Sequence, residues 1–348
     1  MKIKKLQKKL REKNISCIIL SGLSEETALN YLLGFVAERC LLILPKKGNP
    51  FMVAPKMEIP HIRSKTNYKV VPFDEPADIT LKKAVGKHKR IGINKNIITV
   101  KEFEWLKRVF KNKSFVDISS VLYELRAVKS QNEIKMLKKS AQIASKIMRE
   151  TFESLALFRT EAEIKRFMMK KAAMFGCEMA FDPLVASGKN TGFIHYSECN
   201  KRIKKGFFYV DFGVDYKGYK SDITRTTYIG TPSKKEREIF NSLSRIQRET
   251  IKLAKPGVTC SELDQHVRRR LGDFSANFTH ALGHGVGLEV HEEPIISSRS
   301  KTKLKEGMVI TIEPGVYFPG KFGMRIEDTI VITNTGAKVL TTAPKNLI

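Results

Sequence analysis

The chain has 348 residues, of which 42% are hydrophobic and 28% charged, with a formal net charge of +27. This length favours two domains, and the hydrophobic fraction argues against general disorder. No stretch approaches the roughly 20 consecutive apolar residues that a membrane-spanning helix needs. The basic N-terminus MKIKKLQKKLREKN also lacks the apolar core of a signal peptide. We therefore expect a cytoplasmic protein with no membrane partner.

The net charge of +27 allows two interpretations. One is a surface for nucleic acid or another polyanion. The other is a lysine-rich composition spread over solvated helical faces. The basic residues form no single block and are not interleaved with aromatic residues, which favours the second interpretation and argues against a nucleic-acid partner. A basic surface would still attract acidic peptides.

The five cysteines are scattered and form no CxxC pair; they are Cys17, Cys40, Cys177, Cys199 and Cys260. An odd number without paired spacing indicates reduced, mostly buried thiols rather than a disulfide framework or a zinc ribbon. No supporting motif points to a cysteine nucleophile.

The first 120 or so residues alternate short apolar runs with helix-like segments such as Val100–Phe110. The expected strands are Cys17–Ser21, Leu41–Leu44, Phe51–Ala54, Lys69–Phe73, Arg90–Ile93 and Phe115–Asp117. This pattern predicts an α/β domain with a sheet covered by helices. It contains no G-x-G-x-x-G and no catalytic cluster, so it is a scaffold, a dimerisation module or a lid.

A long amphipathic helix follows, with Ser130 as its N-cap. Its apolar stripe consists of Ile134, Leu137, Ala141, Ala144 and Met148. The domain boundary should lie near residues 122–129. We therefore assign residues 1–123 to the N-terminal domain and 124–348 to the C-terminal domain.

The C-terminal domain shows one pattern twice, with helices followed by strands. Capping-box signatures at Thr160/Glu163, Ser233/Glu236 and Thr259/Glu262 open three helices. Strand-rich stretches follow at about residues 180–229 and 278–341. The pattern predicts two similar α+β halves that face each other, although sequence identity between them is too weak to prove duplication.

The segment FFYVDFGVDYKGYKSDITRTTYIG predicts a β-hairpin that turns at Tyr216-Lys217-Gly218. It places Asp211 in the first arm and Asp222 in the second. A carboxylate inside a hydrophobic strand is unfavourable unless something compensates its charge, and two on paired strands repel each other. The DFG string at Asp211 lacks the H-R-D loop and the strand lysine of a kinase.

The second half repeats this feature. Glu313 ends the apolar strand in GMVITIEPGVYF, and Glu327 lies within the strand in GMRIEDTIVI. A single such acid is often neutralised by an arginine or faces the surface. Four inward acids, two from each half, instead require one or two cations.

The segment ALGHGVGLEVHEEP combines three glycines with His284 and His291. A phosphate loop is excluded because no G-K-[ST] and no strand-to-helix context follows. The helical zinc motif H-E-x-x-H fails because Ile295 occupies the place of the second histidine. His284 between glycines is the best imidazole for a carboxylate-rich metal shell. His195 lies in a polar, glycine-rich loop that favours a functional role. His61, His88 and His266 have no such context.

Four segments resemble the pita-bread metallopeptidases in order and spacing: VDFGVDYKGYKSDITRT, HALGHGVGLEVHEEP, GMVITIEPGVY and GMRIEDT. That family includes Xaa-Pro dipeptidase (prolidase), aminopeptidase P and methionine aminopeptidase. The resemblance implies an α+β pita-bread (creatinase/aminopeptidase-like) catalytic domain with pseudo-twofold halves. Together with the creatinase/prolidase-like α/β N-terminal domain, it favours the Xaa-Pro-cleaving members, because minimal methionine aminopeptidases lack that domain.

The resemblance also implies roles for individual residues. The implied metal ligands are Asp211, Asp222, His284, Glu313 and Glu327, with Asp222 and Glu327 bridging two divalent ions. Mn²⁺ or Co²⁺ suit such a site best, and Zn²⁺ or Fe²⁺ also fit it. His195 and His291 would line the substrate pocket, and Tyr317 and Arg325 would orient carboxylates with His280 behind the ligands.

The implied reaction is hydrolysis of an Xaa-Pro bond by a metal-bridged hydroxide, with Glu313 as general base. One metal or His291 would stabilise the oxyanion, and His195 would contact the scissile amide or the leaving group. Arg299 is available for the carboxylate of a dipeptide. Some prolidases carry arginine directly after HEEP, where this chain has Ile295, which weakens the strict dipeptidase assignment.

The substrates would be peptides with proline at the second position, and the family implies a homodimer. Two alternatives stay open. A methionine aminopeptidase-like enzyme would cleave Met-Ala peptides but not Xaa-Pro. A non-catalytic pita-bread protein that binds polyanions or proteins would hold no metal.

Overall fold

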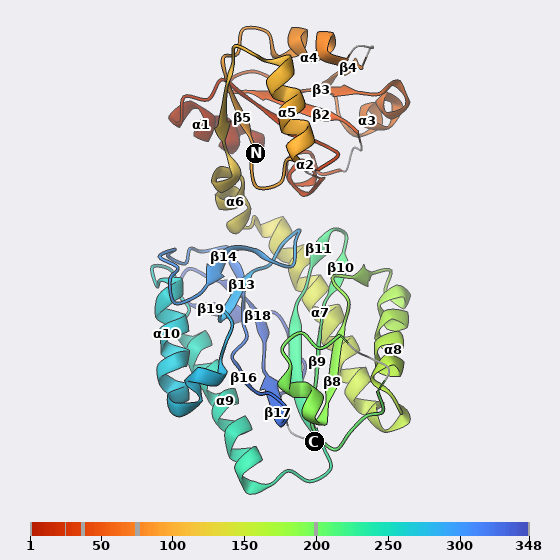
Figure 1. The fold of residues 1–348 in the computed structure, drawn as a ribbon, viewed down its shortest axis with the longest axis vertical. Coiled ribbons are helices and arrows are strands. Elements are labelled where there is room, and N and C mark those ends of the chain that lie inside the picture. Colours follow the sequence, from red (N-terminus) through yellow and green to blue (C-terminus); the bar gives the residue numbers. More distant parts are fainter. Residues whose placement is uncertain (1, 25, 36–38, 74–76, 198–200, 347–348) are drawn as a thin grey trace. The chain divides into compact units, whose positions relative to one another are not determined.

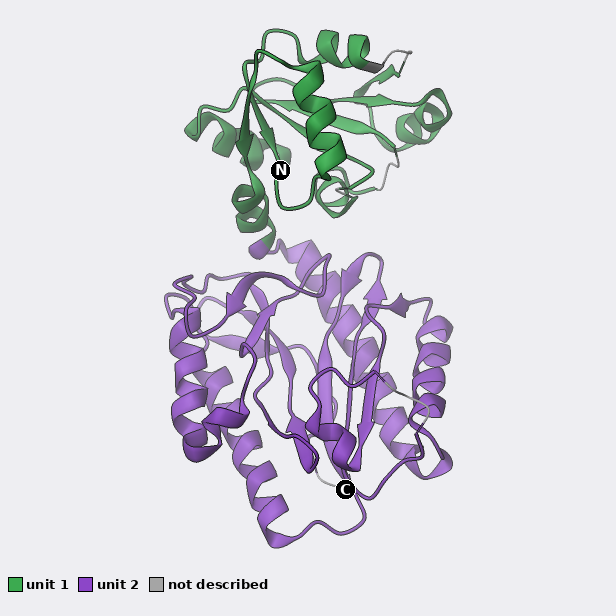
Figure 2. Ribbon diagram, in the orientation of Figure 1, with its two compact units in different colours: residues 1–126 green, residues 127–348 purple. Residues whose placement is uncertain are grey.

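The computed structural model describes residues 2–24, 26–35, 39–73, 77–197 and 201–346. The chain divides into two compact units, Met1–Arg126 and Ala127–Ile348, shown in two colours in Figure 2. The division falls inside helix α6 (Ser119–Ala127). Cys199, one of the five cysteines, lies outside the described residues.

The first unit is built on a six-stranded mixed sheet of order β4-β3-β2-β1-β5-β6. Its strands are β1 (Cys17–Ser21), β2 (Leu41–Pro45), β3 (Phe51–Ala54), β4 (Lys69–Pro72), β5 (Arg90–Ile93) and β6 (Ser114–Asp117). The six strands expected from the sequence are thus present, with ends that differ by at most one residue. The parallel pairs β1–β5, β5–β6 and β3–β4 flank the antiparallel pairs β1–β2 and β2–β3.

Helices accompany this sheet (Figure 1). They are α1 (Lys2–Glu12), α2 (Glu26–Leu33), η1 (Lys56–Glu58), α3 (Ile59–Lys65), α4 (Ala77–Val85) and α5 (Val100–Val109). The side chains of Leu106 and Val109 on α5 join those of Ile19, Ile43 and Ile91 in one buried apolar cluster. The α/β architecture expected for the N-terminal domain is therefore confirmed.

The first half of the second unit begins with two helices, α7 (Gln131–Glu153) and α8 (Glu161–Met174). Ser130 and Glu133 form the complete capping box of α7. The box predicted for α8 is only half formed: Thr160 accepts from the amide of Glu163, while the Glu163 carboxylate accepts from the amide of Arg159 at 2.7 Å. A hydrogen bond from outside the helix has replaced the second half of the box.

Two small sheets follow these helices, of order β12-β9-β8 and β11-β10-β7. Their strands are β7 (Glu178–Met179), β8 (Leu184–Ser187), β9 (Gly206–Phe212), β10 (Val214–Tyr216), β11 (Tyr219–Lys220) and β12 (Ile223–Ile229). Two short 3₁₀ helices also occur in this half: η2 (Leu155–Leu157) between α7 and α8, and η3 (Gly188–Gly192) directly after β8. Lys217 and Gly218 have φ of 54° and 84°, as a tight hairpin turn requires, so the predicted turn is present.

The second half repeats the arrangement. Helices α9 (Lys234–Leu253) and α10 (Cys260–Leu271) both begin with complete capping boxes. The elements that follow are η4 (Gly272–Asn277), β13 (Gly283–Gly285), β14 (Glu292–Ile296), β15 (Val309–Ile312), β16 (Gly315–Phe318), β17 (Phe322–Arg325), β18 (Asp328–Ile332) and β19 (Ala337–Val339). They form a five-stranded sheet of order β14-β13-β15-β18-β19 and the pair β16-β17.

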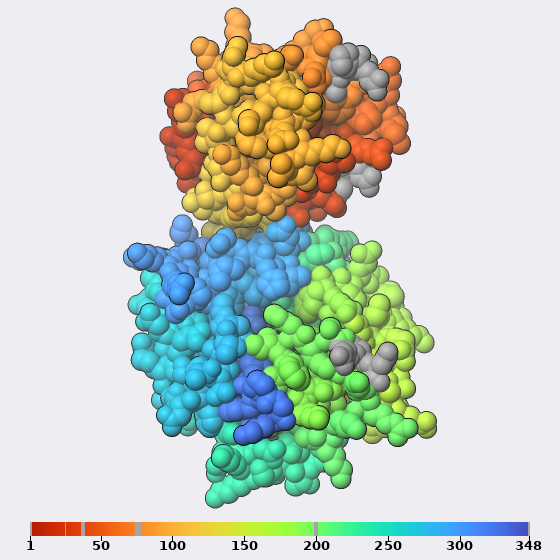
Figure 3. All heavy atoms as spheres, in the orientation of Figure 1, coloured from red at the N-terminus to blue at the C-terminus, as the bar shows by residue number. Residues whose placement is uncertain are grey.

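The strands of the second unit lie between the helix pairs α7/α8 and α9/α10 (Figure 1). The space-filling view shows the green segments of the first half beside the cyan and blue segments of the second (Figure 3). Each helix pair packs on its own buried apolar cluster, one around Ile147 and Phe208, the other around Leu243 and Ile310. This two-half arrangement is the predicted pita-bread architecture.

No helix in the described part of the chain is both long and apolar enough to cross a membrane.

Candidate metal centre

Asp211 and Asp222 come from paired strands of the first half. Asp211 is the next-to-last residue of β9 and lies opposite Thr224 of β12, whereas Asp222 directly precedes β12. Each arm of the hairpin is divided into two short strands, and the two arms approach closely at the break. A Cβ on Gly213 would lie 1.7 Å from the carbonyl oxygen of Ser221. Glycine therefore allows the two strands to close on each other beside the acids.

His284, Glu313 and Glu327 come from the second half. His284 is the central residue of β13, and Glu313 directly follows β15. Glu327 does not lie inside a strand as predicted, but in the two-residue gap between β17 and β18. The chain changes partners there, because β17 pairs with β16 while β18 pairs with β15.

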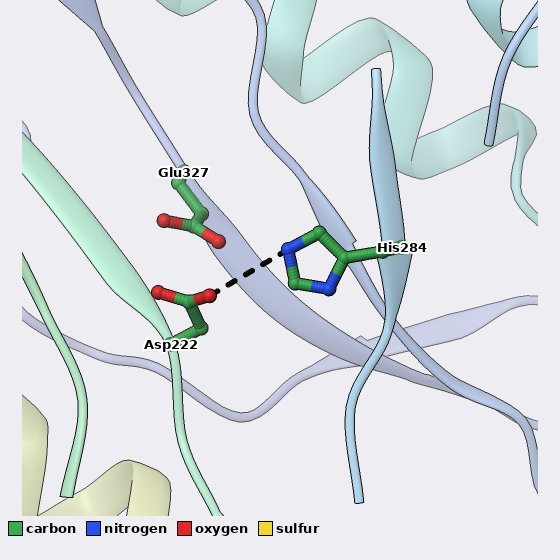
Figure 4. Close-up of side chains that lie close together, drawn as sticks. All are labelled: Asp222, His284 and Glu327. Carbon is green, nitrogen blue, oxygen red and sulfur yellow. Dashed lines mark ion pairs between the residues drawn. The ribbon is translucent and has the colours of Figure 1, made fainter. Parts of the chain in front are cut away.

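These side chains converge. Ligand atoms of Asp222, His284 and Glu327 all lie within 4.8 Å of one another, and Figure 4 shows the three side chains pointing toward a common point. His284 Nε2 is 3.6 Å from an Asp222 oxygen and 3.3 Å from Glu313 Oε1. Its Nδ1 lies 3.1 Å from the carbonyl oxygen of Gly285. Because that carbonyl can only accept, Nδ1 donates to it, and Nε2 is the nitrogen that faces the carboxylates and would bind a cation once it has lost its proton.

Asp211 joins the site through a fixed partner. Arg325 Nη2 donates to Asp211 Oδ2 at 2.5 Å, and Arg325 Nη1 donates to the Tyr317 hydroxyl at 2.6 Å. Tyr317 in turn lies 3.2 Å from His280 Nε2, and His280 Nδ1 donates to the carbonyl of Ala281 at 2.7 Å. The three residues predicted to lie behind the ligands thus form one hydrogen-bonded chain that ends on a carboxylate.

One oxygen of each of three buried carboxylates has no hydrogen-bond partner in the protein. Among the described residues, Asp211 Oδ1, Asp222 Oδ1 and Glu327 Oε1 are buried oxygens without any hydrogen bond. Burial first, and then the charge of Glu327, raises the pKa of Asp222 well above its ordinary value. Burial, and then Glu313 and Asp211, does the same to the pKa of Glu327. Hard oxygens that share a dry site beside an imidazole fit a divalent cation, whose charge would lower both pKa values again.

The pKa of Glu313 is shifted in the opposite direction. Burial alone would raise its pKa, but the hydrogen bond and charge of His284 outweigh burial and lower the pKa to about 2. Thr311 Oγ1 also donates to Glu313 Oε1 at 3.2 Å. Glu313 is therefore held ionised in the site.

A cavity of 390 Å³ opens onto these groups. Its apolar wall is formed by Phe181, Leu184, Ile194, Val290 and Ile295. His195 and His291 line it as expected, and the rings of His291 and His284 have centroids 4.2 Å apart. Arg299 is exposed and is not among the residues that line this cavity.

Sequence reasoning missed two threonines that orient the acids. Thr224 donates to Glu327 Oε2 at 2.8 Å, and Thr311 donates to Glu313. Each lies two residues from an acid, Thr224 after Asp222 and Thr311 before Glu313. Residues two apart on a strand point to the same face, so strand periodicity beside each acid was the available signal.

The remaining histidines and the four described cysteines do not line this cavity. His61 is exposed, and His88 and His266 are partly buried; none of the three lines the cavity. The four described cysteines are buried. Burial raises the pKa of Cys17 to about 12 and that of Cys260 to about 11, which fits inert thiols rather than nucleophiles.

Comparison with known proteins identifies two matching families. Residues 135–334 match metallopeptidase family M24, and residues 2–128 match the creatinase/prolidase N-terminal domain. The chain is 37% identical over 301 residues to the Xaa-Pro dipeptidase of Pyrococcus horikoshii, covering 85% of both chains.

Solved structures give the same grouping. The prolidase from P. horikoshii superposes with a TM-score of 0.92 at 33% identity, covering 100% of this chain and 99% of that one. An X-Pro aminopeptidase from Thermotoga maritima superposes with a TM-score of 0.89 at 30% identity, covering 98% and 99%.

Proposed function

The chain belongs to metallopeptidase family M24, and we propose that its second unit holds two divalent cations and uses them to hydrolyse Xaa-Pro dipeptides. The proposed ligands are Asp211, Asp222, His284, Glu313 and Glu327. One observation carries the proposal: buried oxygens of Asp211, Asp222 and Glu327 have no hydrogen-bond partner, and Asp222 and Glu327 converge with the imidazole of His284. Such a group is unstable without a cation.

Two of the proposed ligands are held by neighbouring side chains before a cation binds. Arg325 holds one oxygen of Asp211 and leaves the other directed into the site. Thr224 does the same for Glu327. Bound divalent cations would lower the pKa of water and polarise the scissile carbonyl.

Glu313 is the proposed proton acceptor. Its carboxylate is ionised and fixed by Thr311 and His284, so it can take a proton at Oε and later return it to the leaving nitrogen. His291 and His195 line the cavity and can donate hydrogen bonds to the substrate carbonyl and the leaving group.

The cavity wall suits a proline ring. A proline imide has no N–H to pair with a protein strand, so recognition must come from a shaped apolar surface. Phe181, Leu184 and Ile194 supply such a surface beside the ligands, and Ile295 extends it. Arg299 remains a prediction for the carboxylate of a dipeptide.

Mn²⁺ or Co²⁺ is the proposed metal, because four of the five ligands are carboxylates. The homodimer that the family resemblance implies and a cytoplasmic location are also proposed, and sedimentation and cell fractionation would test them.

A metal-reconstituted assay tests the function. The protein is stripped of metal, loaded with Mn²⁺ or Co²⁺, and offered an Xaa-Pro dipeptide, an Xaa-Pro-Yaa tripeptide and a Met-Ala peptide. We expect metal-dependent cleavage of the Xaa-Pro bond, and the ratio of the first two rates measures the peptide length preferred. Cleavage of Met-Ala alone would indicate a methionine aminopeptidase. Absence of both metal binding and hydrolysis would contradict the proposal.

A further inference from the structure

A buried ion pair lies close to the site without lining its cavity. Lys129 Nζ is 3.2 Å from Glu292 Oε2, and the two side chains are only 2% and 4% exposed. Burying two charges removes them from water at a cost that an apolar pair would avoid, so such a pair is weak evidence for stability alone. The hydrogen bonds around the two residues indicate a further role for the pair.

The Glu292 carboxylate accepts hydrogen bonds from the turn that precedes it in the chain. Its second oxygen, Oε1, accepts from the backbone amides of Leu288 and Glu289 at 2.9 and 3.1 Å. A Cβ on Gly287 would come within 2.4 Å of Glu292 Oε2, so only glycine allows the carboxylate to lie there. The carbonyl of Gly287 also accepts from the amide of Lys220 at 2.8 Å. The turn is therefore held from both sides.

Lys129 is itself rigidly placed. Its amide donates to the carbonyl of Gly307 at 2.9 Å, and Val128 before it bridges to Met308. The next residue, Ser130, is the N-cap of α7 with a complete capping box. The ammonium group thus extends from a backbone that is fixed on both sides, and it sets the position of the carboxylate it contacts.

His291 is the chain neighbour of Glu292 and closes the same turn. Its ring lies 4.2 Å from that of His284 and lines the cavity. A shift of the Glu292 backbone would move the Cα of His291 with it. A displacement of about 1 Å in a group that contacts the reacting atoms can cost roughly 100-fold in rate.

We propose that Lys129 and Glu292 are positioning residues for hydrolysis, which act by fixing the Gly287–His291 turn and so placing the imidazole of His291 over the metal site. This inference rests on the proposed function. It assigns the pair a role in kcat rather than in metal binding, because neither residue is a ligand.

Substitution of Lys129 tests the role. In Lys129→Met, which keeps the length of the side chain without its charge, we expect kcat for an Xaa-Pro dipeptide to fall about 10- to 100-fold, with KM and metal content close to wild type. Met168→Ala is the matched control. It opens a cavity in the buried cluster around α8 and lowers stability, yet should keep kcat at temperatures below its unfolding transition.

A double-mutant cycle separates positioning from a general structural effect. In a His291→Ala background, Lys129→Met should change kcat less than about twofold, because the group that it positions is gone. An equal loss in both backgrounds, or no loss in the single variant, would overturn the inference. If Lys129→Met does not fold, Gly287→Ala replaces it in the cycle, since its methyl group would displace the Glu292 carboxylate. A metal-loaded wild type without activity would instead count against the proposed function.

Discussion

Replacing Glu327 by glutamine should stabilise the metal-free protein at neutral pH while abolishing hydrolysis. Without a cation, Glu327 is buried among other carboxylates, and burial followed by the charges of Glu313 and Asp211 raises its pKa. Glutamine keeps an oxygen for Thr224 and places an uncharged NH₂ donor where Oε1 has no partner. The variant therefore removes the buried charge and keeps the hydrogen bond from Thr224.

The sign of the pH effect follows from the same raised pKa. Asp222 and Glu327 have folded-state pKa values above their unfolded values, so at these two sites the folded metal-free protein binds more protons than the unfolded chain. The stability that these two acids contribute is then greatest below their unfolded pKa, about 4, and is lost as the pH rises through the folded values. When the folded and unfolded pKa of one acid differ by one, the difference corresponds to about 1.4 kcal/mol of unfolding free energy. The melting temperature changes by roughly 2–4 °C per kcal/mol for a domain of this size.

Thermal unfolding of metal-stripped wild type and Glu327→Gln between pH 5 and 8 measures the effect. We expect the melting temperature of wild type to fall with rising pH relative to the variant, and the variant to melt several degrees higher at pH 8. Metal at about 100 times its dissociation constant should add about 2.7 kcal/mol to wild type and much less to the variant. Parallel pH curves for the two metal-free proteins would refute the electrostatic reasoning.

Four further outcomes are expected, three at the site and one at the buried thiols. Glu313→Gln should lower kcat at least 100-fold, the lower bound for loss of a proton-transfer group, and Asp222→Ala should abolish hydrolysis; near-wild-type turnover in either would contradict the assigned ligands. Arg325→Met removes the partner of Asp211 and should weaken metal binding about 10- to 100-fold, as isothermal titration with Mn²⁺ would show. In a Cys199→Ser variant, a thiol reagent at pH 8 should label the folded protein far more slowly than the unfolded chain. The reason is that burial raises the pKa of Cys17 and Cys40 to about 12. Rapid labelling of the folded protein would show that these thiols are accessible.

Local sequence signals were enough to predict the strands of the first unit and the capped helices of the second unit. The strands of the first unit are short apolar runs between polar segments, and the helices of the second unit begin at Ser and Thr caps whose partners lie three residues away. Both signals depend on neighbours in the sequence. At Thr160 only half of the predicted capping box forms. The Glu163 carboxylate accepts from the amide of Arg159 instead of that of Thr160, and the motif does not include Arg159.

Interactions between distant segments were not predictable in the same way. GMRIEDTIVI reads as one strand, yet it divides at Glu327 because its two parts pair with different strands. The contact between Lys129 and Glu292 joins residues 163 positions apart, and neither carries a sequence signal for the other. The four acids stood out because unfavourable carboxylates recurred in both halves, and the resemblance to the pita-bread metallopeptidases supplied the set of five proposed ligands.

Glu327 and Asp328 are adjacent, both are buried, and their electrostatics are opposite. Arg225 Nη2 lies 2.8 Å from Asp328 Oδ1, Lys345 also pairs with Asp328, and Gln247 donates to it at 3.0 Å. Burial would raise the pKa of Asp328, but Arg225 and Lys345 outweigh burial and lower it. The fold thus neutralises a buried acid with its own cations where the acid is structural. At Glu327, one residue away, Thr224 is the only described residue that donates a side-chain hydrogen bond to the carboxylate, and we propose that a bound metal supplies the missing positive charge.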